Sequence, residues 1–361
     1  MRSVLPLALL LAMLLLPAVA AAPVRADSRD AARAAASFSA MQRYLFDRRS
    51  GDYRERVGGA PGSHAWPFSQ ALAANIAIAG LPRLGVQAPV RARFATLERR
   101  FRSAAVYVAW PHGDLYLDDN EWLAQDFLDW SELAGGAAAR ARAAAIFNAV
   151  VDAWDDVASH PCSGGVFWTT SPANRDRNTV STANGALVGL RLYAATKQAR
   201  YLAWSQRMLA WVDRCMLGPD GLYWDHIDLD GKLDRTHWSY NQGSVIGANV
   251  MLYTLTGDSQ ALARAEQIAD TALAYFADRW TSGEPPAFAA IFFRNLLALA
   301  AADGRQDYVA AAESYGDAAW TSARVARTGL FTFTGKTRLL DQAALVQLYA
   351  ALARQPVTTA P

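Results

Sequence analysis

The sequence has few cysteines and no excess of charge of one sign. Its 361 residues contain only Cys162 and Cys215, too few for a cysteine-rich scaffold, and no C-x-x-C spacing typical of a metal site occurs. Lysine and arginine number 35 against 33 aspartates and glutamates, which leaves a formal net charge of +2 without a basic stripe or an acidic tail. We therefore expect neither a metal site nor a nucleic-acid partner.

The two ends of the chain carry different signals. The C-terminus, LARQPVTTAP, lacks the hydrophobic tail of a lipid-anchor signal. Near the N-terminus an arginine precedes an apolar run from Val4 to Leu16 and the small-residue stretch AVA at 18–20. This pattern is typical of a secretory signal peptide, about residues 1–26, with cleavage between about 20 and 26. The apolar run is short for a membrane span.

Export sets the expectations for the mature chain. We expect about residues 27–361 to form a single soluble domain without a stable membrane anchor, secreted or periplasmic, and monomeric. The signal peptide serves both destinations and does not separate them. An oxidising compartment permits a disulfide between Cys162 and Cys215. Two buried free thiols are the alternative.

Patterns typical of strands are scarce, whereas alanine-rich amphipathic segments occur along the whole chain. They predict twelve helices, at about 28–48, 65–80, 87–103, 119–134, 137–158, 178–197, 199–217, 237–256, 259–278, 286–302, 306–325 and 337–354. Short turns such as GG at 135–136 and TGD at 256–258 alternate with mostly long connections such as 160–177 and 218–235. The helices that follow long connections recur every fifty to sixty residues, roughly, which indicates one helical hairpin per repeat.

Six hairpins can stack as an open solenoid or close into a ring. The helices after the long connections, such as those containing GSVIGANVMLYTL and FAAIFFRNLLALAA, are apolar around most of their circumference, as buried inner helices are. We therefore predict an all-α fold, an (α/α)6 barrel. Its long loops and the N-termini of its inner helices share one end, where we expect the functional site. Both cysteines follow outer helices and lie at this end.

Asp118 and Asp119 stand where a long loop becomes an inner helix. One aspartate at such a place is explained by helix capping. Two adjacent ones also suit retaining glycoside hydrolysis, which uses carboxyl groups about 5–5.5 Å apart, closer than an inverting enzyme needs. We expect both side chains to flank one point in the cleft, because residues at a helix start have non-helical dihedrals. Close carboxylates separate each other's pKa values, so that one remains protonated as an acid.

The stretch LDDNEWLAQDFLDW, residues 117–130, resembles the paired-aspartate motif of glycoside hydrolase family 76, the endo-α-1,6-mannanases and related bacterial and fungal enzymes. Further stretches agree in family order across roughly residues 40–350: SGGVFW, NTVSTANGALVGLRLYAATKQARYLAWSQRMLAWV, DGLYWDHI, HWSYNQGSVIGANVMLYTLTGD and AIFFRNLLALA. The family usually has an aromatic residue before the pair and two tryptophans after it. This chain has Leu117 before it, and Trp122 with Leu123 after it.

The resemblance implies an (α/α)6 catalytic domain that cleaves α-1,6-mannosidic bonds with retention. It implies Asp118 as nucleophile and Asp119 as acid/base, an α-mannan or other mannose-containing glycan as substrate, and no metal or organic cofactor. Candidate substrate-binding residues are Trp122, Trp168, Asn184, Tyr223, Trp224, Asp225, Tyr240, Asn241, Gln242 and Arg294. Most of these residues also have a purely structural alternative. The aromatic rings can pack against the barrel rim, Asp225 can form a turn, Asn184 can make an internal hydrogen bond and Arg294 can form a buried ion pair.

Three other functions stay open. Transglycosylation differs from hydrolysis only in that a sugar hydroxyl replaces water, and the sequence does not separate the two. A sugar epimerase or isomerase on the same fold would need histidines at the ring centre, for which His226 and His237 are candidates. A glycan-binding protein without catalysis would keep the cleft but would not need both aspartates.

Overall fold

The structure, a computed structural model, describes residues 29–81, 84, 86 and 88–355, so the predicted signal peptide lies outside the described residues. The described part contains twelve α-helices, whose ends lie within three residues of the predicted bounds, except that the fifth ends six residues and the eleventh seven residues earlier than predicted. They are α1 (Arg29–Leu45), α2 (Ala65–Ala79), α3 (Val90–Arg100), α4 (Leu117–Ala134), α5 (Ala137–Asp152), α6 (Thr179–Thr196), α7 (Ala199–Cys215), α8 (Ser239–Thr256), α9 (Ser259–Phe276), α10 (Pro286–Asp303), α11 (Gln306–Ala318) and α12 (Leu339–Leu352). A π-helical turn, Ala319–Ala323, extends α11.

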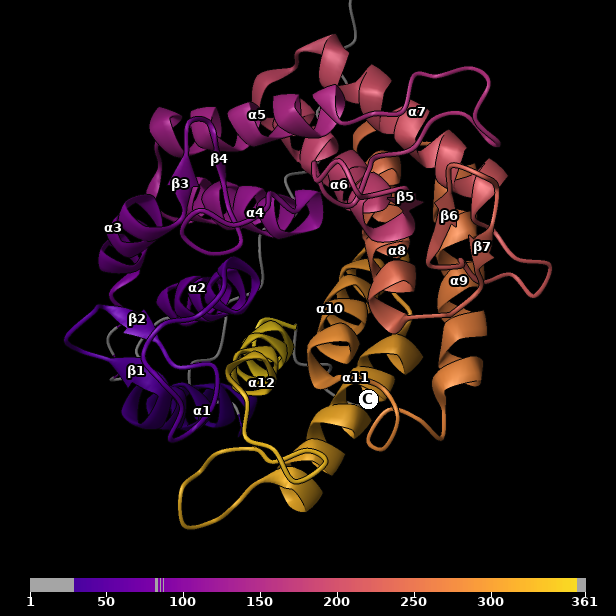
Figure 1. The fold of residues 1–361 in the computed structure, drawn as a ribbon. Coiled ribbons are helices and arrows are strands. Elements are labelled where there is room, and N and C mark those ends of the chain that lie inside the picture. The colour runs from indigo at the N-terminus through magenta and orange to yellow at the C-terminus, as the bar shows by residue number, and fades with distance from the viewer. Residues whose placement is uncertain (1–28, 82–83, 85, 87, 356–361) are drawn as a thin grey trace, which may run out of the picture.

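The even-numbered helices form a closed inner ring. Each packs against the next in the order α2, α4, α6, α8, α10 and α12, and α12 packs back against α2. Helices α3, α5, α7, α9 and α11 cover α2, α4, α6, α8 and α10 from outside, and α1 covers α12. In Figure 1 the yellow α12 lies between the indigo α1 and α2 and the orange α10, where the ring closes. The predicted (α/α)6 barrel is confirmed, and the solenoid is excluded.

The inner helices are buried around most of their circumference. Helix α12 is buried along nearly its whole length, whereas α9 buries one stripe, at Ala261, Ala265, Ile268, Ala269, Ala272 and Phe276. Helix α10 is long and apolar enough to cross a membrane, yet it lies in the ring among other helices. The apolar sequence therefore reflects the inner position of α10 in the barrel.

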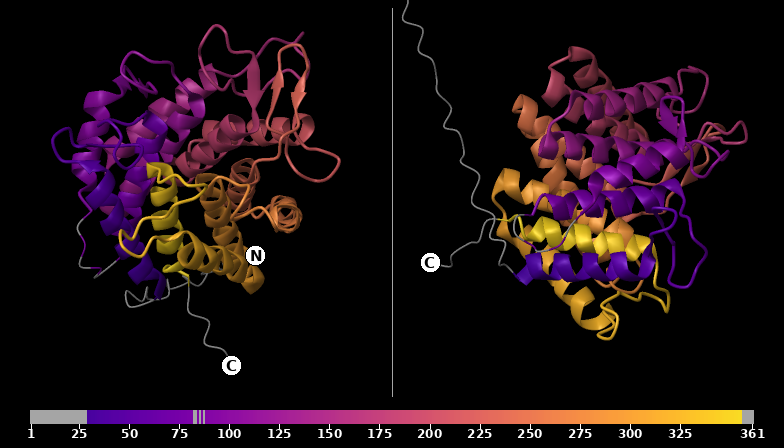
Figure 2. Two further views of the ribbon diagram at one scale, coloured as in Figure 1. Left: turned by 60° about the horizontal axis from the view of Figure 1, so that its bottom comes forward. Right: turned by 90° about the vertical axis from the view of Figure 1, so that its left-hand side faces the viewer.

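Seven short strands lie in the long loops of the described part. They are β1 (Phe46–Asp47), β2 (Asp52–Tyr53), β3 (Arg102–Ser103), β4 (Val106–Tyr107), β5 (Asp176–Asn178), β6 (His226–Asp228) and β7 (Leu233–Asp234). β1–β2 and β3–β4 are antiparallel pairs, and β5–β6–β7 is an antiparallel sheet that joins the loops before α6 and α8. The side view in Figure 2 shows strands and long loops gathered at one end of the helices.

A repeated side-chain clamp fixes three of the long loops to their inner helices. The pairs are Asn120 with Tyr107, Gln242 with Tyr223, and Gln342 with Phe331. In each pair the amide oxygen accepts from the backbone N–H of the loop residue and the amide nitrogen donates to its C=O, at 2.7–2.9 Å. The same nitrogen donates to a carbonyl four residues earlier in the chain. The clamps satisfy buried backbone groups that no strand pairs.

Candidate active site

A pocket of about 370 Å³ opens at the loop end of the barrel. We call it the aromatic pocket. Its lining consists of Glu55, His64, Trp66, Pro67, Ala109, Trp110, Tyr116, Asp118, Asp119, Trp122, Trp168, Tyr240 and Phe288. The first turns of four inner helices, α2, α4, α8 and α10, therefore contribute residues to one cavity, because the N-termini of these helices lie at the same end of the barrel.

Asp118 and Asp119 lie in the first turn of α4 and both line the aromatic pocket. Neither aspartate caps the helix, because Tyr116 holds the N-cap position without a side-chain hydrogen bond. The expectation that α4 begins at 119 was two residues late. Both aspartates therefore have helical backbone, and consecutive helical positions point about 100° apart. Oδ1 of Asp118 is buried without a hydrogen-bond partner among the described residues.

Burial acts on both carboxyl groups but not equally. Loss of hydration raises the pKa of Asp118 to about 7, although hydrogen bonds from the backbone N–H of Asp119 and the side chain of Trp168 oppose the rise. Loss of hydration, and then the charge of Asp118, raise the pKa of Asp119 well above its usual range. Asp118 therefore ionises before Asp119. Near neutral pH the pair carries one charge and one proton, the arrangement that a nucleophile and an acid need.

Aromatic rings form the walls around the pair. Tyr240 stacks on Phe288 with ring centroids 4.0 Å apart and planes 15° apart. Trp168, 39% exposed, meets Tyr116 edge-on at 4.9 Å. Trp122 is almost buried. The pocket thus offers flat apolar surfaces beside two carboxyl groups, a combination that suits a polyhydroxylated ring with apolar faces.

The sequence predicted only part of this wall. It identified Trp122, Trp168 and Tyr240, and it missed Trp66 and Phe288 among others. Both missed rings lie in the first turn of an inner helix, Trp66 in α2 and Phe288 in α10. A search for aromatic residues in the first turn of every predicted inner helix would have found them.

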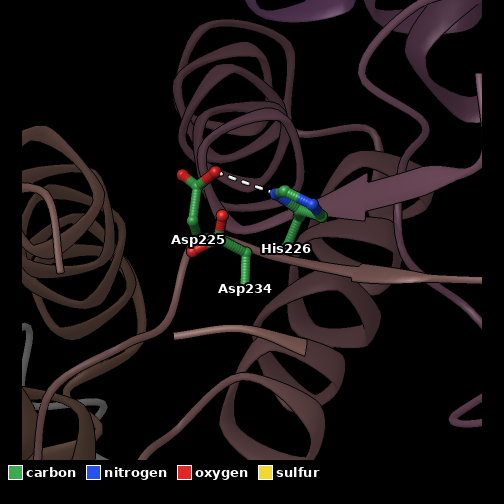
Figure 3. A group of neighbouring side chains, drawn as sticks. All are labelled: Asp225, His226 and Asp234. Carbon is green, nitrogen blue, oxygen red and sulfur yellow. Dashed lines mark hydrogen bonds and ion pairs between the residues drawn. The ribbon is translucent and has the colours of Figure 1, made fainter. Parts of the chain in front are cut away.

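A polar cluster adjoins the pocket on the β5–β6–β7 sheet. Asp225 accepts a hydrogen bond from Asn241 at 3.1 Å. It also binds Nδ1 of His226 at 2.9 Å, and Asp234 lies beside Asp225 and His226 (Figure 3). Asp225 and Asn241 are thus brought together but do not line the aromatic pocket. Asp176, which the sequence reading missed, faces the same cluster and raises the pKa of Asp118 through its charge.

The ligand atoms of Asp225, His226 and Asp234 lie within 4.8 Å of one another, so this cluster has the donor set of a cation site. The negative charges around this cluster favour a positive charge here. The hydrogen bond to Asp225, together with the charges of Asp176 and Asp234, raises the pKa of His226. A protonated imidazole has no lone pair for a metal, and it offsets one of the surrounding negative charges.

Three predicted residues, Tyr223, Trp224 and Gln242, do not line the aromatic pocket. Tyr223 is fully buried and its hydroxyl donates to Asp213 at 2.5 Å. Gln242 is the clamp that holds the backbone of Tyr223. Trp224 packs against the core beneath the guanidinium of Arg235. For Tyr223 and Trp224 these contacts agree with the alternative interpretation, packing of the rings at the barrel rim.

Asn184 and Arg294 lie deeper in the barrel. Asn184 is fully buried and accepts a hydrogen bond from Gln125 at 3.4 Å. Arg294 lines a different pocket together with Asp129 and Arg354. Burial lowers the pKa of Arg294, and the charges of Asp129 and Asp126 oppose this. The acids near Arg294 are therefore not the pair at the loop end.

The histidines proposed for an epimerase do not meet the pair. His226 binds Asp225, and His237 binds Asp220 at 2.8 Å and the carbonyl of Tyr223 at 3.1 Å. Neither lines the aromatic pocket. The structure also joins Cys162 and Cys215 by a disulfide, with Cα atoms 6.0 Å apart, which ties the loop before α6 to the end of α7.

Comparison with known proteins agrees with this geometry. Residues 30–301 match the family described as Glycosyl hydrolase family 76. The chain is 29% identical over 147 residues to mannan endo-1,6-alpha-mannosidase DCW1 of Saccharomyces cerevisiae and 31% identical over 124 residues to that of Candida glabrata. The two matches cover 38% and 31% of this chain, but only 32% and 27% of those relatives, about a third of their length.

Solved structures extend the likeness to the whole barrel. The family 76 mannosidase Bt3792 from Bacteroides thetaiotaomicron is 23% identical with a TM-score of 0.81, over 91% of this chain and 98% of that one. The α-1,6-mannanase GH76A of Salegentibacter sp. HEL1_6, inactivated at two consecutive aspartates and bound to α-1,6-mannotriose, is 22% identical with a TM-score of 0.77, over 89% and 98%. At these identities the likeness establishes a shared fold.

Proposed function

Because this chain belongs to glycosyl hydrolase family 76, we propose that it is an endo-acting enzyme that hydrolyses α-1,6-mannosidic bonds in mannan-type polysaccharide with retention of configuration. The observation that carries the proposal is the pair of consecutive aspartates, Asp118 and Asp119, in the lining of an aromatic pocket. The activities named for the fungal relatives and for the Salegentibacter enzyme agree with this substrate.

In the first step the ionised Asp118 attacks the anomeric carbon. A bond forms between a carboxylate oxygen and C1, the glycosidic C1–O bond breaks, and the leaving oxygen takes the proton of Asp119. Asp118 suits the nucleophile because its pKa of about 7 lets it ionise first. Asp119 suits the acid because burial and the neighbouring charge keep its proton in place.

In the second step Asp119 acts as a base. It takes a proton from water, the water oxygen bonds to C1, and the bond between C1 and Asp118 breaks, so both carboxyl groups return to their starting states. Two inversions at C1 leave the α configuration. Consecutive Cα atoms are about 3.8 Å apart, so adjacent aspartates can place their carboxyl groups at the short separation of a retaining site.

We further propose that the mature chain, about residues 27–361, is exported as a single monomeric catalytic domain, secreted or periplasmic. The signal-peptide pattern predicted for about residues 1–26 supports this proposal. A disulfide between Cys162 and Cys215 agrees with an oxidising compartment.

Product analysis tests the activity. The mature protein, Asp118→Asn and Asp119→Asn are each incubated with unbranched α-1,6-mannan, and the anomeric form of fresh products is read by proton NMR. We expect α-configured oligosaccharides from the wild type and at least a hundredfold slower release from either variant. β-Configured products would reject the retaining route. Binding without release by the folded wild type would identify a glycan-binding protein, and longer products made with added mannose acceptors would identify a transglycosylase.

A further inference from the structure

A second and larger cleft, of about 970 Å³, meets the aromatic pocket. The two cavities share Glu55, His64 and Trp110, so a chain that leaves the aromatic pocket on this side enters the cleft. We call it the basic cleft, after four cationic side chains in its lining: Arg56, Arg100, Lys336 and Arg338. Among the described residues, Glu55 is the only acidic one in its lining.

The first and last long loops of the barrel build this cleft. The backbone N–H of Leu339 donates to the carbonyl of Glu55 at 2.8 Å, and that of Val57 donates to the carbonyl of Thr337 at 3.4 Å. Arg56 and Arg338 thereby lie directly opposite each other in an antiparallel bridge. At such a position the Cα atoms are about 4.5 Å apart and the side chains share one face. Like charges placed opposite each other in this way destabilise a fold.

The nearby acids compensate only part of this charge. Arg100 forms an ion pair with the buried Asp52, and the guanidinium of Arg338 lies 3.8 Å from Asp341. His64 binds the one acid in the lining, Glu55, through its ring and its backbone N–H. Arg56 and Lys336 are exposed, and neither has a carboxylate at ion-pair distance among the described residues. Two cations therefore face the cleft without a counter-charge.

We propose that the basic cleft binds an anionic group, a phosphate or a carboxylate, carried by the glycan a few sugar units from the bond that is cleaved. The proposal deepens the function proposed above and rests on it for the position of that bond. Guanidinium groups bind planar carboxylates and phosphates through two parallel hydrogen bonds, and an ammonium group adds a further charge. A bound anion would also relieve the repulsion between Arg56 and Arg338.

Binding can be measured without turnover in the Asp118→Asn/Asp119→Asn double variant. Isothermal titration uses three α-1,6-mannan oligosaccharides of equal length: a neutral one, one with a phosphate monoester at an end unit and one with a terminal uronate. We expect the phosphate or the uronate form to bind about tenfold more tightly than the neutral form at low salt. The anionic oligosaccharide that binds more tightly than the neutral one identifies the anion. The gain falls in 0.5 M sodium chloride because salt screens exposed charges.

Charge removal then locates the anion. Adding Arg56→Gln/Lys336→Gln to the inactive variant should bring the affinity ratio between anionic and neutral oligosaccharides to within about twofold of one. Arg91→Gln/Lys197→Gln removes the same charge from exposed positions at the opposite end of the barrel and should leave the ratio unchanged. Equal affinity for all three oligosaccharides would overturn the proposal. An equal drop of the affinity ratio in both charge variants would overturn it too.

Failure of the two proposals is distinguishable. If the active protein does not cleave neutral α-1,6-mannan but the titration shows the anionic preference, the activity is wrong and the anion site stands. If neutral mannan is cleaved and the titration shows no preference, the activity stands and the anion site is overturned.

Discussion

Tyr240 and Phe288 stack face to face across the gap between α8 and α10, with centroids 4.0 Å apart. Both rings line the pocket that holds Asp118 and Asp119. The pair therefore joins two inner helices at the wall of this pocket.

Removal of one ring of this stack should weaken substrate binding. Tyr240→Ala is expected to raise KM for α-1,6-mannan two- to tenfold, roughly, because an aromatic contact contributes about 0.5–1.5 kcal/mol. Tyr240→Phe keeps the ring and should stay closer to the wild type. Tyr275→Ala removes an exposed tyrosine of α9 that does not line the pocket, and serves as the control in steady-state kinetics. An unchanged KM in Tyr240→Ala would contradict this reading.

The activity should have a bell-shaped pH dependence. Catalysis requires ionised Asp118 and protonated Asp119, so kcat/KM should fall as the pH drops through about 7, the pKa of Asp118. It should fall again at higher pH as Asp119 loses its proton. The two limbs belong to the coupled pair.

Asp176 offers a direct test of this assignment. Its negative charge raises the pKa of Asp118. In Asp176→Asn the acidic limb should therefore move to lower pH, while the alkaline limb moves less. Asp230→Asn removes an equal charge from an exposed turn of the neighbouring loop and should leave the acidic limb in place. A profile of kcat/KM that is identical in Asp176→Asn and the wild type would show that the limb reports another group.

Glu121 should make the protein less stable at neutral pH than in acid. It is fully buried one turn after Asp118, and among the described residues neither of its carboxyl oxygens has a hydrogen-bond partner. Loss of hydration, and then the charge of Asp118, raise its pKa well above the usual range. The folded state therefore holds this proton over a pH range in which the unfolded chain has released it, so its contribution to stability falls as pH rises above about 4.5.

The neutral isostere removes this penalty. Glu121→Gln should have a higher Tm than the wild type at pH 7, with a difference that shrinks toward pH 4, measured by thermal melts across that range. Glu132→Gln, an exposed acid on the same helix, should show no such pH-dependent gain. Parallel melting curves for Glu121→Gln and the wild type at every pH would exclude a raised pKa at Glu121.

The disulfide should stabilise the loop end. It joins residues that lie 53 positions apart in sequence. Such a cross-link restricts the unfolded chain and thereby stabilises the folded state by about 2–4 kcal/mol. Cys162→Ser/Cys215→Ser should lower the free energy of unfolding by that amount in urea titrations. Addition of dithiothreitol should destabilise the wild type and leave the double variant unaffected. An equal effect of the reductant on both proteins would show that the bond contributes nothing.

The sequence predicted the helices and the ring because both depend on local or repeated signals. The amphipathic period gave the twelve helices, and the alternation of short and long connections indicated hairpins. The contrast between FAAIFFRNLLALAA and the half-exposed partner helices indicated which helices lie inside. The aspartate pair was identified because its two residues are adjacent in the sequence and because the surrounding stretch resembles the paired-aspartate motif of glycoside hydrolase family 76.

Side-chain direction was not predictable in the same way. Tyr240, Asn241 and Gln242 are consecutive, yet only Tyr240 lines the aromatic pocket. Asn241 binds Asp225 and Gln242 clamps the backbone of Tyr223, because successive helical residues point about 100° apart. The order of residues in the sequence does not by itself predict which of these side chains faces the cavity.

The sequence by itself thus determined the helices, their pairing into hairpins and the two carboxyl groups, since these follow from periodicity, composition and neighbours in the chain. Only the tertiary structure decided which residues meet across the barrel. It placed Phe288 against Tyr240, Asp176 near Asp118 and Arg56 opposite Arg338. These residues lie from 48 to 282 positions apart; packing of neighbouring hairpins brings the first two pairs together, and closure of the ring brings Arg56 to Arg338.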